Sequence, residues 1–387
     1  MDVDRFVEGA APGELVTSGG DMAFNPDPLP PEIDLTDDLL GVFTEATRNV
    51  GQLSGIGRRV DHPSMLISPF IYKEAVVSSE IEGTRVTLSD LYEFEAGKEG
   101  DSEGPTRNEL QEVINYVKAV FEGLQYVPEE GITNDLIRRL HYTLTSGVRG
   151  EEKQPGEFRD TEVYIGGSGS EARFVPPPPS IVPYAMRNLE TYIQTGGRYE
   201  QLIDIGLVHY QFETIHPFRD GNGRMGRLLI MLMLCESEWL PDPYLYPSTY
   251  FNRNREQYTD LLLAVSQRGA WEEWLEFFLR GISSQAEEAF TRASELLDLR
   301  DAYRDRYRSA ANSVSQLAIE VFSTPYITPR EAEDLLGMSY HTANNAIRTL
   351  EEDGVLEEIT GNSRNRVFQA REVFDILQKP ATELRIA

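Results

Sequence analysis

The residues with the clearest chemical potential lie together at positions 216–227, which read His-Pro-Phe-Arg-Asp-Gly-Asn-Gly-Arg-Met-Gly-Arg. His216 can titrate near neutral pH and act as a general base. Asp220 offers a hard carboxylate oxygen of the kind that Mg²⁺ prefers. The Gly-Asn-Gly at 221–223 precedes an apolar run, so backbone N–H groups at the start of the next helix can point at an anion. The segment therefore predicts a phosphate-binding site with a base beside it.

Two arginines at the start of the same apolar run strengthen this prediction. Arg224 and Arg227 are three residues apart, so they lie near one face of a first helical turn. Arginine opposes the dipole at a helix N-terminus, which indicates a bound anion or an acidic partner. The Gly-x-Gly-x-x-Gly spacing at 221–226 also matches a dinucleotide fingerprint, but the segment before it is helical in pattern and no βαβ unit surrounds it. A plain helix start capped by Asp220 explains that residue and Gly221, but not the histidine and the arginines.

Composition excludes several classes of protein. A chain of 387 residues suggests two or three domains, and 40% apolar residues argue against disorder. Cys235 is the one cysteine, so no disulfide can form within the chain. The apolar run Leu228–Leu234 is far too short to span a membrane, and the first residues lack the pattern of a signal peptide. We therefore expect a cytoplasmic protein without membrane contact.

The charge is strongly negative, with 36 basic against 64 acidic residues and a net charge of −28. Such a field repels nucleic acids and anionic membranes. Only 5 of the basic residues are lysines. Many acidic residues and few lysines favour a protein from a salt-loving host, in which ions screen the repulsion between the acidic side chains. An ordinary acidic protein is the alternative.

Apolar residues at helical spacing dominate the chain. Thr36 is a predicted N-cap for a helix that continues to Leu53. Ser68 as N-cap, Pro69 in the first turn and Gly83 at the end predict a second helix. Further helices are predicted over 107–124, 133–147, 181–195, 201–213, 224–239, 254–267 and 271–308.

Few strands are predicted. Residues 162–165 and 172–175 flank a Gly-rich stretch and predict a β-hairpin, and the prolines at 176–179 stop its second strand. Near the C-terminus, residues 354–368 predict a strand, a turn and a strand after two short helices. Residues 1–35 contain a proline cluster and are predicted to form an irregular arm.

The segment 216–227 resembles the Fic motif, His-x-Phe-x-Asp/Glu-Gly-Asn-Gly-Arg-x-x-Arg, at every fixed position. Fic enzymes transfer AMP from ATP to a hydroxyl group of a target protein, although relatives move phosphate or phosphocholine with the same loop. The resemblance implies a mostly α fold, with a Fic-type helical core and a β-hairpin flap. It implies His216 as the base and Asp220 as the Mg²⁺ ligand. The residues implied to bind ATP are Val163, Tyr164, Ile165, Gly166, Gly221, Asn222, Gly223, Arg224, Arg227 and Tyr258, with Glu82 beside them.

A second motif lies at the end of the helix predicted over 68–83. Ser78 and Glu82 are four residues apart and share a face, and Glu80 and Glu82 oppose the dipole unless a cation meets them. A solvated acidic helix end is the plain alternative. The stretch from Ser78 to Gly83 resembles the Fic inhibitory motif, Ser/Thr-x-x-x-Glu-Gly/Asn. The resemblance implies that Glu82 pairs with Arg227, draws it away from the γ-phosphate of ATP and autoinhibits the enzyme. In some members the same glutamate supports removal of AMP.

The resemblance extends over most of the chain and implies its domain organisation. It implies a target protein that binds through the flap, and it is compatible with a homodimer that masks or frees the inhibitory helix. The implied units are an N-terminal region at 1–100, a catalytic core at 101–285 with its flap at 161–176, a helical connector at 286–312 and a winged helix at 313–387.

The rival hypothesis is a DNA-binding regulator that uses the Fic core as a nucleotide-sensing scaffold. Residues 315–387 carry 7 basic and 12 acidic side chains, which disfavours binding to DNA. A scaffold would not need His216, Asp220 and Arg227, and all three are present. The side chains that could contact DNA are Tyr340, His341, Asn344, Asn345, Arg348, Arg364 and Arg366.

Overall fold

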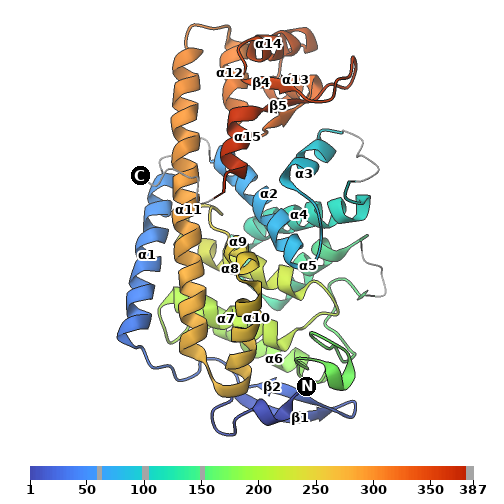
Figure 1. Cartoon of the computed structure of the whole chain (residues 1–387), viewed down its shortest axis with the longest axis vertical. Helices are drawn as coiled ribbons and strands as arrows, with labels where there is room; N and C mark the ends of the chain where they lie inside the picture. Colours follow the sequence, from blue (N-terminus) through green and yellow to red (C-terminus); the bar gives the residue numbers. More distant parts are fainter. Residues whose placement is uncertain (59–62, 98–103, 149–152, 381–387) are drawn as a thin grey trace.

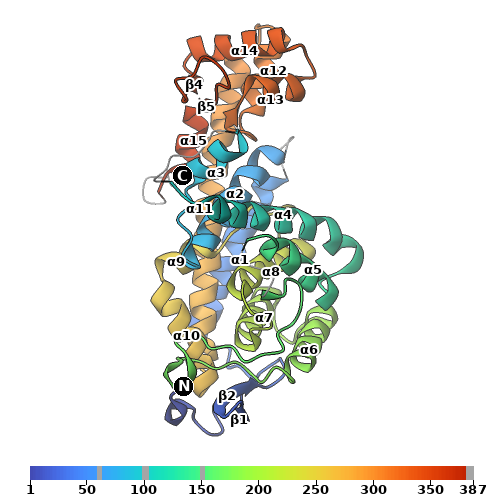
Figure 2. The ribbon, with the colours of Figure 1, turned by 90° about the vertical axis from the view of Figure 1, so that its right-hand side faces the viewer.

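The computed structural model describes residues 1–58, 63–97, 104–148 and 153–380, so the last residues of the predicted winged helix lie outside the described part. The fold is mostly helical, as predicted, and its strands form two small sheets in the described residues. Helix α1 (Asp37–Gly57) packs along α11 (Trp271–Arg306), which runs most of the length of the molecule (Figures 1 and 2). The predicted N-cap is present, because Thr36 accepts a hydrogen bond from the backbone N–H of Leu39.

The centre of the core consists of α7 (Gln201–Ile215) and α8 (Asn222–Glu236), which are buried on nearly all sides. Around them pack α4 (Arg107–Glu130), α5 (Asn134–Thr145), α6 (Val182–Thr195), α9 (Ser248–Arg253) and α10 (Arg255–Arg268). The predicted patterns for these helices are confirmed to within a few residues, except that the short α9 was not predicted. Among the described residues, no helix is both long and apolar enough to cross a membrane.

Helix α2 (Ser64–Ile81) begins earlier than predicted. Ser68 is therefore not its N-cap, and Pro69 lies inside the helix rather than in its first turn. Met65 and Leu66 are buried in the core, and this packing keeps the turn before the proline helical. The helix ends as predicted, with Glu82 and then a left-handed glycine, Gly83. The short helix α3 (Leu88–Glu95) follows and was not predicted.

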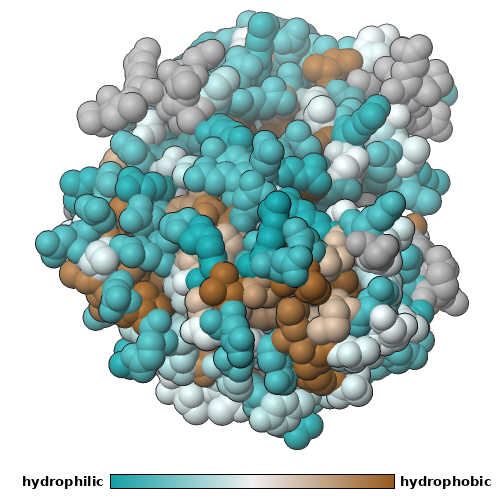
Figure 3. Space-filling model, turned by 60° about the horizontal axis from the view of Figure 1, so that its bottom comes forward, coloured by the Kyte–Doolittle hydropathy of each residue, from teal (hydrophilic) through white to brown (hydrophobic). Residues whose placement is uncertain are grey.

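The N-terminal arm is not irregular, which corrects the prediction. Strands β1 (Gly13–Ser18) and β2 (Asp21–Pro26) form an antiparallel hairpin after a 3-10 turn at Val3–Arg5. Two glycines with positive φ make its tight turn, a hairpin signal that the proline cluster obscured. Figure 3 shows apolar side chains gathered among polar ones at the end of the molecule that carries this hairpin.

The flap (residues 161–176) does not contain the two strands that the sequence predicts. The described residues show one bridge, in which Ile165 and Phe174 exchange backbone hydrogen bonds, and a 3-10 turn at Gly169–Glu171. Residues on both sides of the flap form hydrogen bonds with the N-terminal hairpin. The carbonyl of Val175 accepts from the N–H of Phe24 at 3.0 Å. The flap is therefore held both by its own bridge and by the N-terminal hairpin.

The C-terminal elements are stacked at one end of α11 (Figure 1). The predicted connector at 286–312 is mostly the second half of α11 itself. Strands β3 (Tyr326–Ile327), β5 (Phe368–Ala370) and β4 (Leu356–Glu358) lie in that order in an antiparallel sheet. β4 lies within the predicted strand–turn–strand at 354–368, whereas β5 begins only at the last residue of that range. The winged-helix description stays a prediction. The elements are α12 (Asn312–Glu320), β3 (Tyr326–Ile327), α13 (Pro329–Leu336), α14 (Tyr340–Glu352), β4 (Leu356–Glu358), β5 (Phe368–Ala370) and α15 (Arg371–Gln378).

Candidate active site

The turn between α7 and α8 holds the motif residues in a fixed shape. His216 ends α7 in the left-handed conformation, with φ of 50°, and Gly221 begins α8 with φ of 77°. The buried amide of Asn222 closes the turn, because its Oδ1 accepts from the N–H of Phe218 and its Nδ2 donates to the carbonyl of Phe218, both at 2.8 Å. Asn222 is therefore a structural clamp within the predicted anion loop.

Two further side chains hold this turn from outside. Arg159 is buried and its Nε donates to the carbonyl of His216 at 2.8 Å. His141 accepts from the N–H of Gly156 through Nδ1 at 2.9 Å, so its Nε2 carries the proton and donates to the carbonyl of Asp220 at 2.8 Å. Burial lowers the pKa of His141 to about 4, so it is neutral at pH 7. Neither residue was among the predicted site residues.

His216 has one ring nitrogen available for chemistry. Its Nδ1 lies 3.3 Å from the carbonyl of Glu213, one turn earlier on α7, so Nδ1 is the nitrogen that donates a proton. This tautomer leaves Nε2 without a proton and able to accept one. Burial lowers the pKa of His216 to about 4, so the base is in its neutral form at pH 7.

Arg227 and the end of α2 form the contact that the sequence predicts. Arg227 is 1% exposed, and its Nε and Nη2 donate to the Oγ and the carbonyl of Ser78, both at 2.9 Å. Its Nη2 also donates to Glu82 Oε1 at 2.8 Å. Burial acts to raise the pKa of Glu82, but the charge and hydrogen bond of Arg227 outweigh it and hold that pKa below its ordinary value. The predicted ion pair is therefore present.

A cavity of about 260 Å³ lies where α2, α7, α8, α10 and the flap meet. Six of the predicted residues line it: Glu82, Ile165, His216, Gly223, Arg227 and Tyr258. The other predicted binding, metal and inhibitory residues are not among the described residues that line it: Ser78, Gly83, Val163, Tyr164, Gly166, Asp220, Gly221, Asn222 and Arg224. Tyr164, for example, donates through its hydroxyl to Asp21 of the N-terminal hairpin at 2.9 Å.

Two descriptions of known protein families match consecutive parts of this chain. The description of the Fic/DOC family N-terminal region matches residues 40–125, and that of the Fic/DOC family matches residues 131–234. The chain therefore contains a Fic/DOC N-terminal region followed by a Fic domain.

Two relatives, one bacterial and one from an insect, are similar to part of this chain. A probable protein adenylyltransferase of Aquifex aeolicus is 30% identical over 200 residues, which is 49% of this chain and 53% of that protein. A protein adenylyltransferase Fic of Drosophila melanogaster is 28% identical over 164 residues, 42% of this chain and 32% of that protein. The match thus spans about half the length of the bacterial relative and about a third of the insect one.

Solved structures share the Fic fold at lower identity. A Fic family protein from Desulfovibrio desulfuricans has a TM-score of 0.57 and 21% identity, covering 88% of this chain and 98% of its own. Fic-1 from C. elegans has a TM-score of 0.50 and 19% identity, covering 67% of this chain and 74% of its own. These likenesses show the fold.

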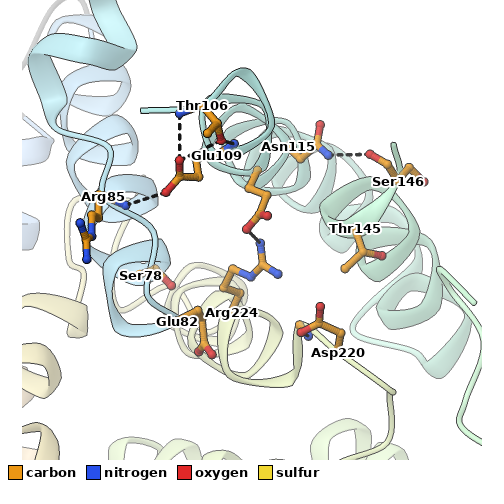
Figure 4. Close-up of polar contacts among 12 residues, drawn as sticks. Ser78, Glu82, Arg85, Thr106, Glu109, Asn115, Thr145, Ser146, Asp220 and Arg224 are labelled. Atoms are coloured by element: carbon orange, nitrogen blue, oxygen red, sulfur yellow. Dashed lines mark hydrogen bonds and ion pairs between the residues drawn. The ribbon is translucent and has the colours of Figure 1, made fainter. Parts of the chain in front are cut away.

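The two arginines of the Fic motif face different neighbours. Arg224 is 1% exposed and points toward α4, where its Nη1 lies 3.3 Å from Glu112 Oε2. Figure 4 shows Arg224 directed toward this helix, with Glu82 and Asp220 on either side of it. The sequence predicted an acidic partner or an anion for both arginines, and each has an acidic partner.

Tyr258 closes the far wall of the Fic cavity. Its hydroxyl lies 2.8 Å from Nε2 of His209, whose Nδ1 lies 3.2 Å from the carbonyl of Gly226, so Nδ1 donates and Tyr258 donates to Nε2. The ring stacks on Phe251 at 4.8 Å between centroids. Tyr258 is thus held rigidly where it meets the cavity.

Several lining residues were missed by the sequence analysis. Phe174, Arg255 and Leu262 line the cavity from the flap and α10, and only their place in the fold reveals them. Glu213 also lines it, and burial raises the pKa of this carboxyl group to about 7. Its position three residues before His216 was a signal, because that spacing places both on one helix face.

Proposed function

We propose that this Fic protein transfers AMP from ATP to a hydroxyl side chain of a target protein. The observation that carries the proposal is that His216, Arg227 and the flap residues Ile165 and Phe174 line one cavity. A base, a phosphate-binding cation and a segment that can hold a peptide thus meet in one space. The names of the relatives, protein adenylyltransferases, support the same activity.

The proposed step needs little covalent chemistry from the protein. The target hydroxyl oxygen attacks the α-phosphorus of ATP, and the bond from that phosphorus to the oxygen bridging to the β-phosphorus breaks. AMP becomes attached to the target and pyrophosphate leaves. The hydroxyl proton passes to Nε2 of His216, which its contact with Glu213 keeps unprotonated. Positioning and charge stabilisation supply the rest.

The phosphates would bind at the N-terminus of α8. Gly223 lines the cavity there, and a Cβ on it would lie 2.4 Å from Glu82 Oε1 and 2.9 Å from Arg227 Nη1. Glycine therefore leaves the backbone accessible where the helix dipole favours an anion. Arg227 would bind the γ-phosphate once Glu82 has moved away.

Asp220 fits a magnesium ion that arrives with the triphosphate. No group of three or more His, Cys, Asp or Glu that could hold a metal is found among the described residues. Mg²⁺ commonly takes one or two carboxylates together with phosphate oxygens and water, so a single aspartate is an adequate protein ligand. Oδ1 of Asp220 accepts from the N–H of Gly221 at 2.8 Å, which orients the carboxylate. The ion would neutralise charge on the phosphates.

Autoinhibition by α2 is part of the proposal. Arg227 donates to Glu82 and Ser78, so a γ-phosphate must displace the glutamate before it can use that arginine. Activation then requires Glu82 to turn away while the buried part of α2 stays in place. The target, which we expect to bind along the flap, and a homodimer that masks or frees α2 are further parts of this proposal, as is a cytoplasmic location.

The test is labelling with α-³²P-ATP and Mg²⁺ at high salt, comparing wild type, Glu82→Gly and Glu82→Gly with His216→Ala. We expect Glu82→Gly to label itself or a lysate protein about tenfold or more strongly than wild type, and the double variant not at all. Glu80→Gly is the matched control, because Glu80 is exposed in the same helical turn. Failure of every variant to take up label would overturn AMP transfer. Equal labelling by wild type and Glu82→Gly would overturn autoinhibition alone.

The rival function, DNA binding through residues 313–387, gains no support from the contacts of its candidate side chains. Arg348 lies 3.3 Å from Glu352, and Arg366 donates to Asn344 at 2.8 Å. Two of the basic groups are therefore engaged within the C-terminal elements, and the local charge remains negative.

A further inference from the structure

Glu213 is an unusual carboxyl group for a cavity that we expect to bind ATP. It lies on α7 one turn before His216 and lines the cavity. Its Oε1 is buried and receives no hydrogen bond within the described part of the chain. Buried polar atoms nearly always have a partner, so this oxygen calls for one beyond those that the described residues supply.

The position of this carboxyl group is fixed by close packing. A Cβ on Gly226 of α8 would lie 2.4 Å from Glu213 Oε1, so the glycine makes the room that the carboxyl occupies. Helices α7 and α8 therefore hold Glu213 at the wall of the cavity. Arg227, which follows Gly226 on α8, lines the same cavity. Arg227 itself donates to Ser78 and Glu82 on α2.

The charged and titratable groups around Glu213 come from four helices. Arg227 on α8 lowers its pKa, Glu82 on α2 raises it, and burial outweighs both, so that the pKa is about 7. Tyr258 on α10 donates to His209, and His216 on α7 is neutral at pH 7. A triphosphate would add several negative charges to this space. An ionised Glu213 would repel them, whereas a neutral acid carries an O–H that can donate to a phosphate oxygen.

We propose that Glu213 is a positioning residue for the donor nucleotide and that its carboxyl group, as a neutral acid, donates a hydrogen bond to the phosphate chain beside Arg227. This inference rests on the proposed nucleotide-binding function. It assigns to Glu213 a role that the Fic motif, which begins at His216, does not contain. One consequence is that protonation of Glu213 and binding of nucleotide favour each other.

The experiment measures ATP affinity by calorimetry at pH 6 and pH 8 in the Glu82→Gly, His216→Ala background, which opens the cavity and stops turnover. The matched variant adds Glu213→Gln, which keeps a donor but cannot ionise. ATP itself titrates in this range, but equally with both proteins. Between pH 6 and pH 8 we expect the affinity of the Glu213 protein to fall about tenfold more than that of the glutamine variant.

A second variant, Glu213→Leu, keeps the volume but removes the hydrogen bond, and covers the case in which the glutamine variant does not fold. We expect it to bind ATP about tenfold more weakly than the Glu213 protein at pH 6, and with a smaller difference at pH 8. The same pH dependence in all three proteins would overturn the role of Glu213 while leaving nucleotide binding intact. Absence of ATP binding in all of them would overturn the proposed function as well.

Discussion

Nη2 of Arg227 and Oε1 of Glu82 lie 2.8 Å apart, although 145 residues separate them in the chain. Arg227 is fully buried, while a third of the Glu82 side chain is exposed and Glu82 lines the cavity. The arginine is therefore fixed by its surroundings, and the glutamate is the partner that can move. This asymmetry is what a displaceable inhibitor requires.

The ion pair between Glu82 and Arg227 makes the stability of the fold depend on pH. The pKa of Glu82 is lowered in the folded protein, so the contribution of the pair to stability is present above the ordinary pKa of a glutamate and is lost as the pH falls through the lowered value. We expect the difference in unfolding midpoint between wild type and Glu82→Gln to be constant near neutral pH and to shrink below about pH 4. Urea unfolding of both proteins from pH 3 to pH 8 measures it. A difference that grew in acid would contradict the pairing.

Ser78 is expected to contribute to the same contact through its hydroxyl group. Ser78→Ala leaves a buried donor of Arg227 without its partner, at a cost of about 1–3 kcal/mol in the free energy of unfolding. Ser79→Ala is a close control, because Ser79 is equally buried on the same helix but its Oγ has no hydrogen-bond partner among the described residues. We expect the control to change the free energy by less than about 0.5 kcal/mol. Similar losses in both variants would refute a specific role for Ser78.

Glu112 is expected to hold Arg224 and, with it, the start of α8. Glu112→Ala removes the carboxylate of a buried ion pair, and breaking such a pair should destabilise the fold by about 3–5 kcal/mol. Glu129→Ala, at an exposed position on the same helix, serves as the control. Chemical denaturation measures both. A cost for Glu112→Ala no larger than that of the control would show that Arg224 does not depend on this partner.

The buried histidines predict a loss of stability in acid. Burial lowers the pKa of His141 to about 4 and that of His209 to about 3, so the unfolded chain binds more protons than the folded one below about pH 6.5. Stability should therefore fall as the pH drops from about 6.5 to about 4, by on the order of 3 kcal/mol for each histidine. Replacing His209 by glutamine should flatten part of this slope in urea titrations. An unchanged slope would mean that His209 is not buried in its neutral form.

The sequence alone determined the motif at 216–227, the second motif that begins at Ser78, and most of the helices. Helices with a regular apolar face, such as α1 with its Thr36 cap, are specified by local spacing and local hydrogen bonds. The pairing of Glu82 with Arg227 could also be predicted, because a family resemblance linked two separate motifs.

Only the tertiary structure decided where the remaining groups lie. Arg224 and Arg227 share a helix face in sequence, yet Arg224 pairs with Glu112 of α4 and Arg227 with Glu82 at the end of α2. The flap contains a single bridge rather than two strands, and Val175 bonds to the N-terminal hairpin, a contact between segments far apart in the chain. Glu213 is one more polar residue in a helix as far as the sequence shows, and only the packing against Gly226 of α8 reveals that its Oε1 is buried without a hydrogen bond from the described residues. Local pattern fixes which residues are present on an element, whereas packing fixes what each side chain meets.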